Sequence, residues 1–134
     1  MNTPKKNKPH LHRVVITLLC MLAFVGLWYA SKPKLSHTSL SPRHVYRVEY
    51  YDASFIQRII HYKMKIPTFV RLYRNDPEVL LGESKVVDMW MNGQLYWWFE
   101  SPLNVVQIGN DVVFENIPPE CMNCERLTPS QVMP

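Results

Sequence analysis

The longest run of apolar positions lies near the N-terminus, over residues 14–30 (VVITLLCMLAFVGLWYA). It contains no charged residue and one weakly polar residue, Thr17. As a helix it would be about 26 Å long, near the shortest length that crosses the hydrocarbon core of a bilayer. A buried core helix normally shows a polar stripe, whereas here every face is apolar. The pattern therefore predicts a transmembrane helix, with the lipid bilayer as its partner.

The charges that flank this run predict its direction. Residues 1–13 form a short basic tail with four lysines and arginines, whereas the far flank carries Lys32 and Lys34. The excess of positive charge on the first side places the N-terminus in the cytoplasm and the remainder of the chain outside it. Trp28 and Tyr29 suit the outer headgroup layer, where amphipathic rings settle.

A cleavable signal peptide also has a basic start and an apolar middle, so the two possibilities differ at the cleavage site. Cleavage after Ala30 would place Trp28 where a small residue is required. An uncleaved signal anchor is therefore favoured, and a cleaved signal is the alternative.

Charge is distributed unevenly along the chain. All eleven acidic residues follow the apolar run. Residues 31–134 also carry eleven lysines and arginines in total, so their formal net charge is zero. The basic balance of the whole chain thus comes from its N-terminal tail. We expect no nucleic-acid partner.

After the span, residues 31–44 hold two prolines and four serines without apolar periodicity, which is typical of a linker. Residues 45–134 then predict one β-rich domain. Strands are expected where branched and aromatic residues alternate with polar ones, with Gly82 marking a bulge or bend and Gly109-Asn110 forming a turn. The expected strands cover 45–51, 68–74, 78–91, 94–99, 104–108 and 111–116. The predicted fold class is α+β, with about six mostly antiparallel strands in a sheet or small sandwich and one short helix.

The short helix is predicted over residues 53–62, with Asp52 or Ser54 as its cap. Its apolar residues fall on one side at helical spacing, so we expect that side to lie on the sheet. These residues are Phe55, Ile56, Ile59 and Ile60.

Asn92-Gly93 is the strongest local signal in the domain, because both residues tolerate the positive φ of a two-residue type I′ hairpin. A hairpin joining 86–91 to 94–99 would place four large side chains on one face: Met89, Met91, Tyr96 and Trp98. Both faces of this ribbon are apolar, so it is either covered on both sides or exposes one face. An exposed face would be these four residues, as a docking surface for a protein partner. Asp88, on the opposite face, is expected to be structural, with an indole N–H, Arg71 or Arg74 as its partner.

Cys121 and Cys124 are separated by two residues, a spacing that suits three chemistries. Outside the cytoplasm a plain disulfide is the default. A redox-active pair needs a depressed thiol pKa, which the neighbouring Glu120 and Glu125 oppose. A zinc site would need two further ligands. We rank the disulfide first and keep the other two as alternatives.

The chain carries no nucleophile elbow, zinc-protease motif or glycine-rich phosphate loop. Dispersed carboxylates could still converge, as in a hydrolase, but nothing in their spacing indicates it: Glu49, Asp52, Glu83, Asp88 and Glu115. We therefore predict no catalytic, cofactor-binding or metal-binding residues, and no enzyme activity.

Four stretches resemble a family of small signal-anchored proteins of Gram-negative bacteria with no assigned activity. They are YRVEYY (46–51), FVRLYR (69–74), LLGES (80–84) and DVVFENIPPEC (111–121) with Cys124 after it. The resemblance implies an inner-membrane protein with a periplasmic domain, and an association with secretion or toxin gene clusters. The expected function is a membrane-anchored periplasmic binding module that neutralises a toxin or helps to assemble an envelope complex. A thiol-disulfide oxidoreductase that uses Cys121 and Cys124 is the alternative.

Overall fold

The computed structural model describes residues 8–99, 102–125 and 128. The chain divides between Lys32 and Pro33 into two compact units. The first contains one helix, α1 (Lys8–Ala30), in which the hydroxyl of Thr17 donates a hydrogen bond to the carbonyl oxygen of Arg13 at 2.9 Å. Its apolar stretch, His10–Ala30, has a mean hydropathy of 2.0 and is exposed within the unit. By length and composition this helix could cross a membrane.

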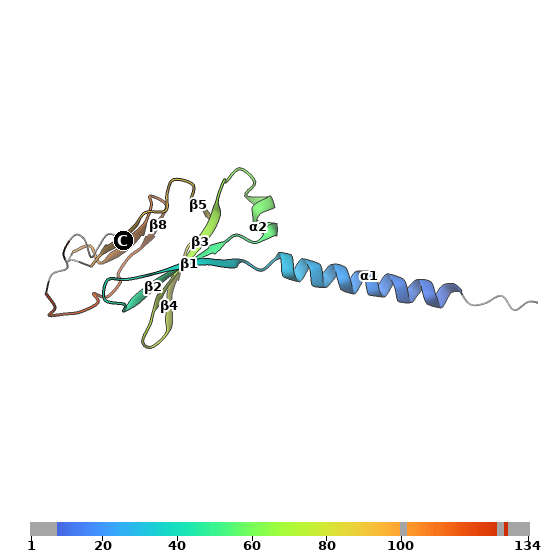
Figure 1. Cartoon of the computed structure of the whole chain (residues 1–134), viewed down its shortest axis with the longest axis horizontal. Coiled ribbons are helices and arrows are strands. Elements are labelled where there is room, and N and C mark those ends of the chain that lie inside the picture. Colours follow the sequence, from blue (N-terminus) through green and yellow to red (C-terminus); the bar gives the residue numbers. More distant parts are fainter. Residues whose placement is uncertain (1–7, 100–101, 126–127, 129–134) are drawn as a thin grey trace, which may run out of the picture. The chain divides into compact units, whose positions relative to one another are not determined.

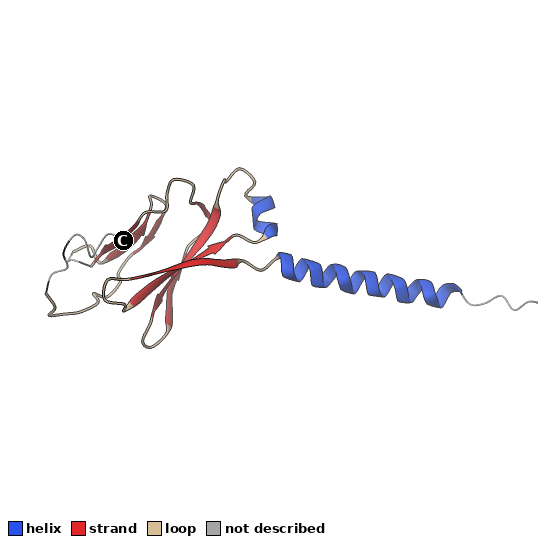
Figure 2. Ribbon diagram, viewed as in Figure 1, coloured by secondary structure: helices blue, strands red, loops and turns tan. Residues whose placement is uncertain are grey.

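The second unit is built from antiparallel strands (Figures 1 and 2). The first sheet has the strand order β1-β2-β3-β4, and β5 also pairs with β3. Its strands are β1 (Lys34–Leu40), β2 (Tyr46–Asp52), β3 (Pro67–Arg74), β4 (Val79–Glu83) and β5 (Val87–Asp88). The second sheet, in the order β6-β7-β8, consists of β6 (Leu95–Trp98), β7 (Val105–Ile108) and β8 (Val112–Phe114). A short helix, α2 (Phe55–Ile60), connects β2 to β3. The predicted α+β class is confirmed, with eight strands among the described residues.

The two sheets share one hydrophobic core. Alternate side chains of β2 and β3 face alternate side chains of β6, β7 and β8, because successive residues of a strand point to opposite faces of a sheet. The first sheet contributes Tyr46, Val48, Tyr50, Val70 and Leu72; the second contributes Leu95, Trp97, Val106, Ile108 and Val112; and Ile117 follows. The domain is therefore a small sandwich, one of the two layouts that the sequence predicted.

The predicted linker over residues 31–44 is corrected by β1, which pairs with β2 from Lys34 opposite Asp52 to Leu40 opposite Arg47. β1 is an edge strand and most of its side chains are exposed, so it carries no apolar alternation. Backbone hydrogen bonds to β2 hold it in place, and the ring of His37 stacks on Tyr50 at 4.0 Å. The folded domain thus begins about ten residues before the predicted start at residue 45.

The hairpin predicted at Asn92-Gly93 is wrong. β5 pairs with β3 and β6 pairs with β7, so the segments on either side of these residues belong to different sheets. Neither residue has the positive φ that a type I′ turn requires. Instead, the Asn92 side chain accepts a hydrogen bond from the backbone N–H of Asn110 at 2.8 Å and donates one to Asp111. Contacts with the distant β7–β8 turn outweigh the local turn preference.

The prediction that the short helix packs on the sheet is also wrong. Ser54 caps α2 as expected: its hydroxyl accepts a hydrogen bond from the backbone N–H of Gln57, and its own backbone N–H donates to the Gln57 side chain. Phe55, Ile59 and Ile60 are nevertheless exposed. The reason lies in the connection, because β2 ends at Asp52 directly opposite Thr68 of β3. The segment between these strands therefore stands at the end of the sheet and does not cross its face.

Candidate binding surface on the second sheet

Strand β6 separates its four side chains by alternation. Leu95 and Trp97 are buried in the core, whereas Tyr96 and Trp98 lie on the opposite face. The rings of Tyr96 and Trp98 stack with their centroids 5.9 Å apart, and the Tyr96 hydroxyl donates to Gln94 Oε1 at 2.8 Å. The strand therefore presents two aromatic rings, already ordered against each other, on the side of the sheet away from the core.

The neighbouring strands extend this surface. Trp98 pairs with Val105, Tyr96 pairs with Gln107, and Gln107 pairs with Val113. We call these five residues the Tyr96–Trp98 face. Trp98 is 42% exposed and Val113 is 48% exposed, and none of the five side chains is charged. The side-chain amide of Gln107, which lies between Tyr96 and Val113 on this face, donates a hydrogen bond to the carbonyl oxygen of Gly109 at 2.9 Å. This bond holds the amide in place.

The outer face of the first sheet has a different chemistry. Arg47 pairs with Glu49 at 2.7 Å and Arg71 pairs with Glu83 at 2.5 Å, while the Tyr51 hydroxyl donates to Glu49 at 2.7 Å. Partial burial would raise the pKa of Glu49, but hydrogen bonds from Arg47 and Tyr51 and the nearby arginine charges outweigh it, so this pKa is lowered. The charged groups of this face are thus paired with each other.

The structure divides the four residues that the sequence grouped as a docking surface. Tyr96 and Trp98 lie side by side on β6, but Met89 packs against the core and Met91 is 91% exposed in the turn after β5. Because the predicted hairpin does not form, nothing places the two methionines in register with β6.

Sequence reasoning missed Val105 and Val113. Both belong to short branched runs that alternate between the core and the opposite face. That alternation can be recognised in the sequence of each strand. Which strand lies beside β6 depends on long-range pairing, which the sequence of one strand does not indicate.

Asp88 is structural, but its partners differ from those predicted. Its carboxylate accepts hydrogen bonds from the backbone N–H groups of Ile66, Lys65 and Trp90 at 2.9, 3.0 and 3.1 Å. The bonds from Ile66 and Lys65 are the main cause of its lowered pKa. The side chain ties the turn after β5 to the segment that enters β3.

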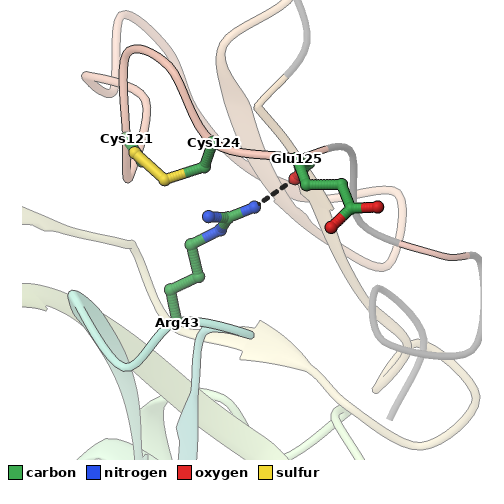
Figure 3. The surroundings of a disulfide bond; sticks show 4 residues. All are labelled: Arg43, Cys121, Cys124 and Glu125. Atoms are coloured by element: carbon green, nitrogen blue, oxygen red, sulfur yellow. Dashed lines mark hydrogen bonds between the residues drawn. A yellow bond between two sulfur atoms is a disulfide. The ribbon is translucent and has the colours of Figure 1, made fainter.

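Cys121 and Cys124 form a disulfide, with their Cα atoms 5.7 Å apart, and both residues are exposed. The side chain of Arg43 extends toward it and its guanidinium donates a hydrogen bond to the carbonyl oxygen of Glu125 (Figure 3). Upstream, the Tyr46 hydroxyl donates to the carbonyl oxygen of Pro118 at 2.6 Å. These bonds fasten the segment that carries the disulfide to Arg43 in the loop before β2 and to Tyr46, the first residue of β2.

Three of the five carboxylates that a hydrolase could use have separate structural partners. Glu49 and Glu83 pair with different arginines, and Asp88 binds backbone N–H groups. Within the described ranges, histidine, cysteine and acidic side chains form no group of three or more that could hold a metal ion.

Comparison of the chain with protein-family models, with curated proteins and with solved structures finds no match. The family resemblance noted in the sequence stays a prediction.

Proposed function

We propose that this chain is a membrane-anchored binding module of the bacterial inner membrane, with a cytoplasmic N-terminus and a periplasmic domain that binds a protein partner without catalysing a reaction. Helix α1, long and apolar enough to span a bilayer, supports the anchor. The basic flank before it supports the orientation.

The observation that carries the binding function is the Tyr96–Trp98 face. Exposed apolar patches are uncommon on monomers and mark interaction sites when they are contiguous. Tryptophan and tyrosine are enriched among the residues that dominate binding energy. The outer face of the first sheet is a weaker candidate, because its arginines and glutamates already neutralise one another. A secreted toxin and a subunit of an envelope complex are the two partner classes that the sequence suggests.

The test is affinity capture of the full-length tagged protein from detergent-solubilised envelopes, followed by measurement of the dissociation constant with the purified partner. Trp98→Ala is expected to weaken binding roughly 30-fold or more, as for a central residue of an interface. Met91→Ala is the matched control, since this side chain is exposed but lies off the face, and it should bind like the wild type. Equal binding by both variants would reject the Tyr96–Trp98 face.

The exposed disulfide supports a second candidate, a thiol-disulfide oxidoreductase. A dithiol substrate would pass two electrons and two protons to the Cys121–Cys124 disulfide, leaving two thiols on this chain and a disulfide on the substrate. The Arg43 guanidinium lies toward this pair, and a nearby cation stabilises a thiolate (Figure 3).

Iodoacetamide labelling of the reduced protein separates the two functions. An oxidoreductase should have one cysteine that reacts rapidly at neutral pH, and Arg43→Ala should slow that reaction. A pair that reacts no faster than an ordinary thiol would leave the disulfide a structural link, worth about 2 kcal/mol for so short a loop.

A further inference from the structure

One end of the first sheet gathers the start of the domain and helix α2. Lys34, the first residue of β1, pairs with Asp52, which also pairs with Thr68 of β3. Residues 53–66, including α2, connect Asp52 to β3 and therefore stand at the end of the sheet where β1 begins (Figure 1).

This end exposes a group of large apolar side chains. We call it the α2 patch: Phe55, Ile59, Ile60, Tyr62, Ile66 and Trp90. Each of these side chains is between 40% and 75% exposed. Helix α2 consists mostly of apolar residues, yet none of its residues is buried. Trp90 belongs to this end because its backbone N–H binds Asp88, whose carboxylate also holds Lys65 and Ile66.

The charges around the α2 patch are mostly positive. Residues 53–66 contain Arg58, Lys63 and Lys65 but no acidic residue. Lys65 Nζ lies 4.4 Å from the centre of the Trp90 ring, and Lys63 Nζ lies 5.9 Å from that of Tyr62. Two acidic residues border this segment. Asp52 directly precedes it and lines the same pocket as Arg58 and Lys65. The carboxylate of Asp88, which lies opposite Pro67, already accepts hydrogen bonds from three backbone N–H groups. Apolar side chains interspersed with lysine and arginine, with aromatic rings among them, match the chemistry of a bilayer surface.

The covalent chain limits how far this end can lie from the membrane. α1 ends at Ala30 and β1 begins at Lys34, so three residues join them. An extended chain covers at most about 14 Å over that interval. A tether this short gives a high effective concentration, so a weak surface contact suffices.

We propose that the α2 patch binds the anionic surface of the bilayer that holds α1, with Phe55, Ile59 and Ile60 among the acyl chains and Lys63 and Lys65 at the headgroups. This inference rests on the proposed membrane anchor. The second contact holds the periplasmic domain in one orientation, where a three-residue tether alone would let it turn.

The test uses the full chain with Cys20→Ser, reconstituted in phosphatidylcholine vesicles that contain phosphatidylglycerol. An environment-sensitive fluorophore is attached at Ile59→Cys. The matched control is Val79→Cys, an exposed apolar position that pairs with Arg74 at the opposite end of β3. Nitroxide-labelled lipids are expected to quench the label at position 59 several-fold more than the label at position 79. Omission of phosphatidylglycerol, or the double change Lys63→Glu and Lys65→Glu, should reduce this difference several-fold.

Vesicle flotation distinguishes failure of the anchor from failure of this inference. If the protein floats with the vesicles while the labels at positions 59 and 79 are equally exposed to water, the anchor is present but the surface contact is not. The inference is then overturned. A label at position 59 that is dry but not quenched by nitroxide lipids is covered by protein, which also overturns it. A protein that does not float lacks the anchor, and both proposals fall.

Discussion

Gly82 of β4 lies directly against the ring of Phe114 of β8. A Cβ atom at Gly82 would lie 2.7 Å from Cδ1 and 2.8 Å from Cε1 of this ring, closer than side-chain atoms approach one another. Gly82 also borders the bulge at which the pairing of β3 with β4 shifts, as the sequence predicted. The missing side chain lets an aromatic ring of the second sheet pack against the edge of the first.

Gly82→Ala is therefore expected to lower the free energy of unfolding by about 1–3 kcal/mol through overpacking. Urea unfolding of the detergent-solubilised full chain, followed by tryptophan fluorescence, measures this. Adding Phe114→Leu should recover part of the loss, because the smaller side chain makes room for the methyl group. If Gly82→Ala is as stable as the wild type, the contact is loose enough to yield.

Asn92 fastens the crossing between the sheets to the β7–β8 turn. Asn92→Ala removes the acceptor for the Asn110 N–H and the donor to Asp111, and should cost about 1 kcal/mol. Asn92→Asp keeps the acceptor but sets two carboxylates against each other, so its stability should improve as the pH falls toward the pKa of aspartate. The same unfolding experiment at pH 7 and in acid measures both. Equal stability of the three proteins at pH 7 would contradict this role.

Asp88 should make acid stability depend on one carboxylate. Backbone N–H groups lower the pKa of Asp88 in the folded state below the ordinary value of 3.8. The contribution of Asp88 to the free energy of unfolding is therefore fully present above pH 3.8 and is lost as the pH falls through the folded-state pKa. Asp88→Asn presents an NH₂ group to one of these N–H donors and should be less stable at neutral pH. Melting temperatures across the acid range should converge for the two proteins. A constant difference at every pH would show that the charge has no part in it.

Tyr50 should affect stability at alkaline pH. Burial raises the pKa of its phenol from 10.0 to about 12, with its ring against His37. The raised pKa belongs to the folded state, so this contribution is complete below pH 10 and is lost as the pH rises through about 12. Ultraviolet titration of the folded protein should show a late tyrosine that Tyr50→Phe removes. Titration of every tyrosine near its ordinary pKa would contradict this burial.

Local patterns in the sequence predicted much of the fold. The apolar run of α1, the alternation in β2, β3, β7 and β8, the Ser54 cap and the Gly109-Asn110 turn depend on residues within a few positions of one another. Such signals survive in the folded domain when the core requires the same arrangement. The polar strand β1 escaped prediction because an edge strand is held by backbone bonds, which leave no apolar pattern.

The candidate surface depended on pairing that no local pattern contains. Alternation along β6 predicted that Tyr96 and Trp98 share a face, and the structure confirms this. Val105 and Val113 lie beside these two residues, and Met89 packs against the core, only in the tertiary structure. The reason is that strand pairing depends on the packing of the whole two-sheet core. For the same reason, Asn92-Gly93 became a crossing between sheets, although its local preference favours a hairpin.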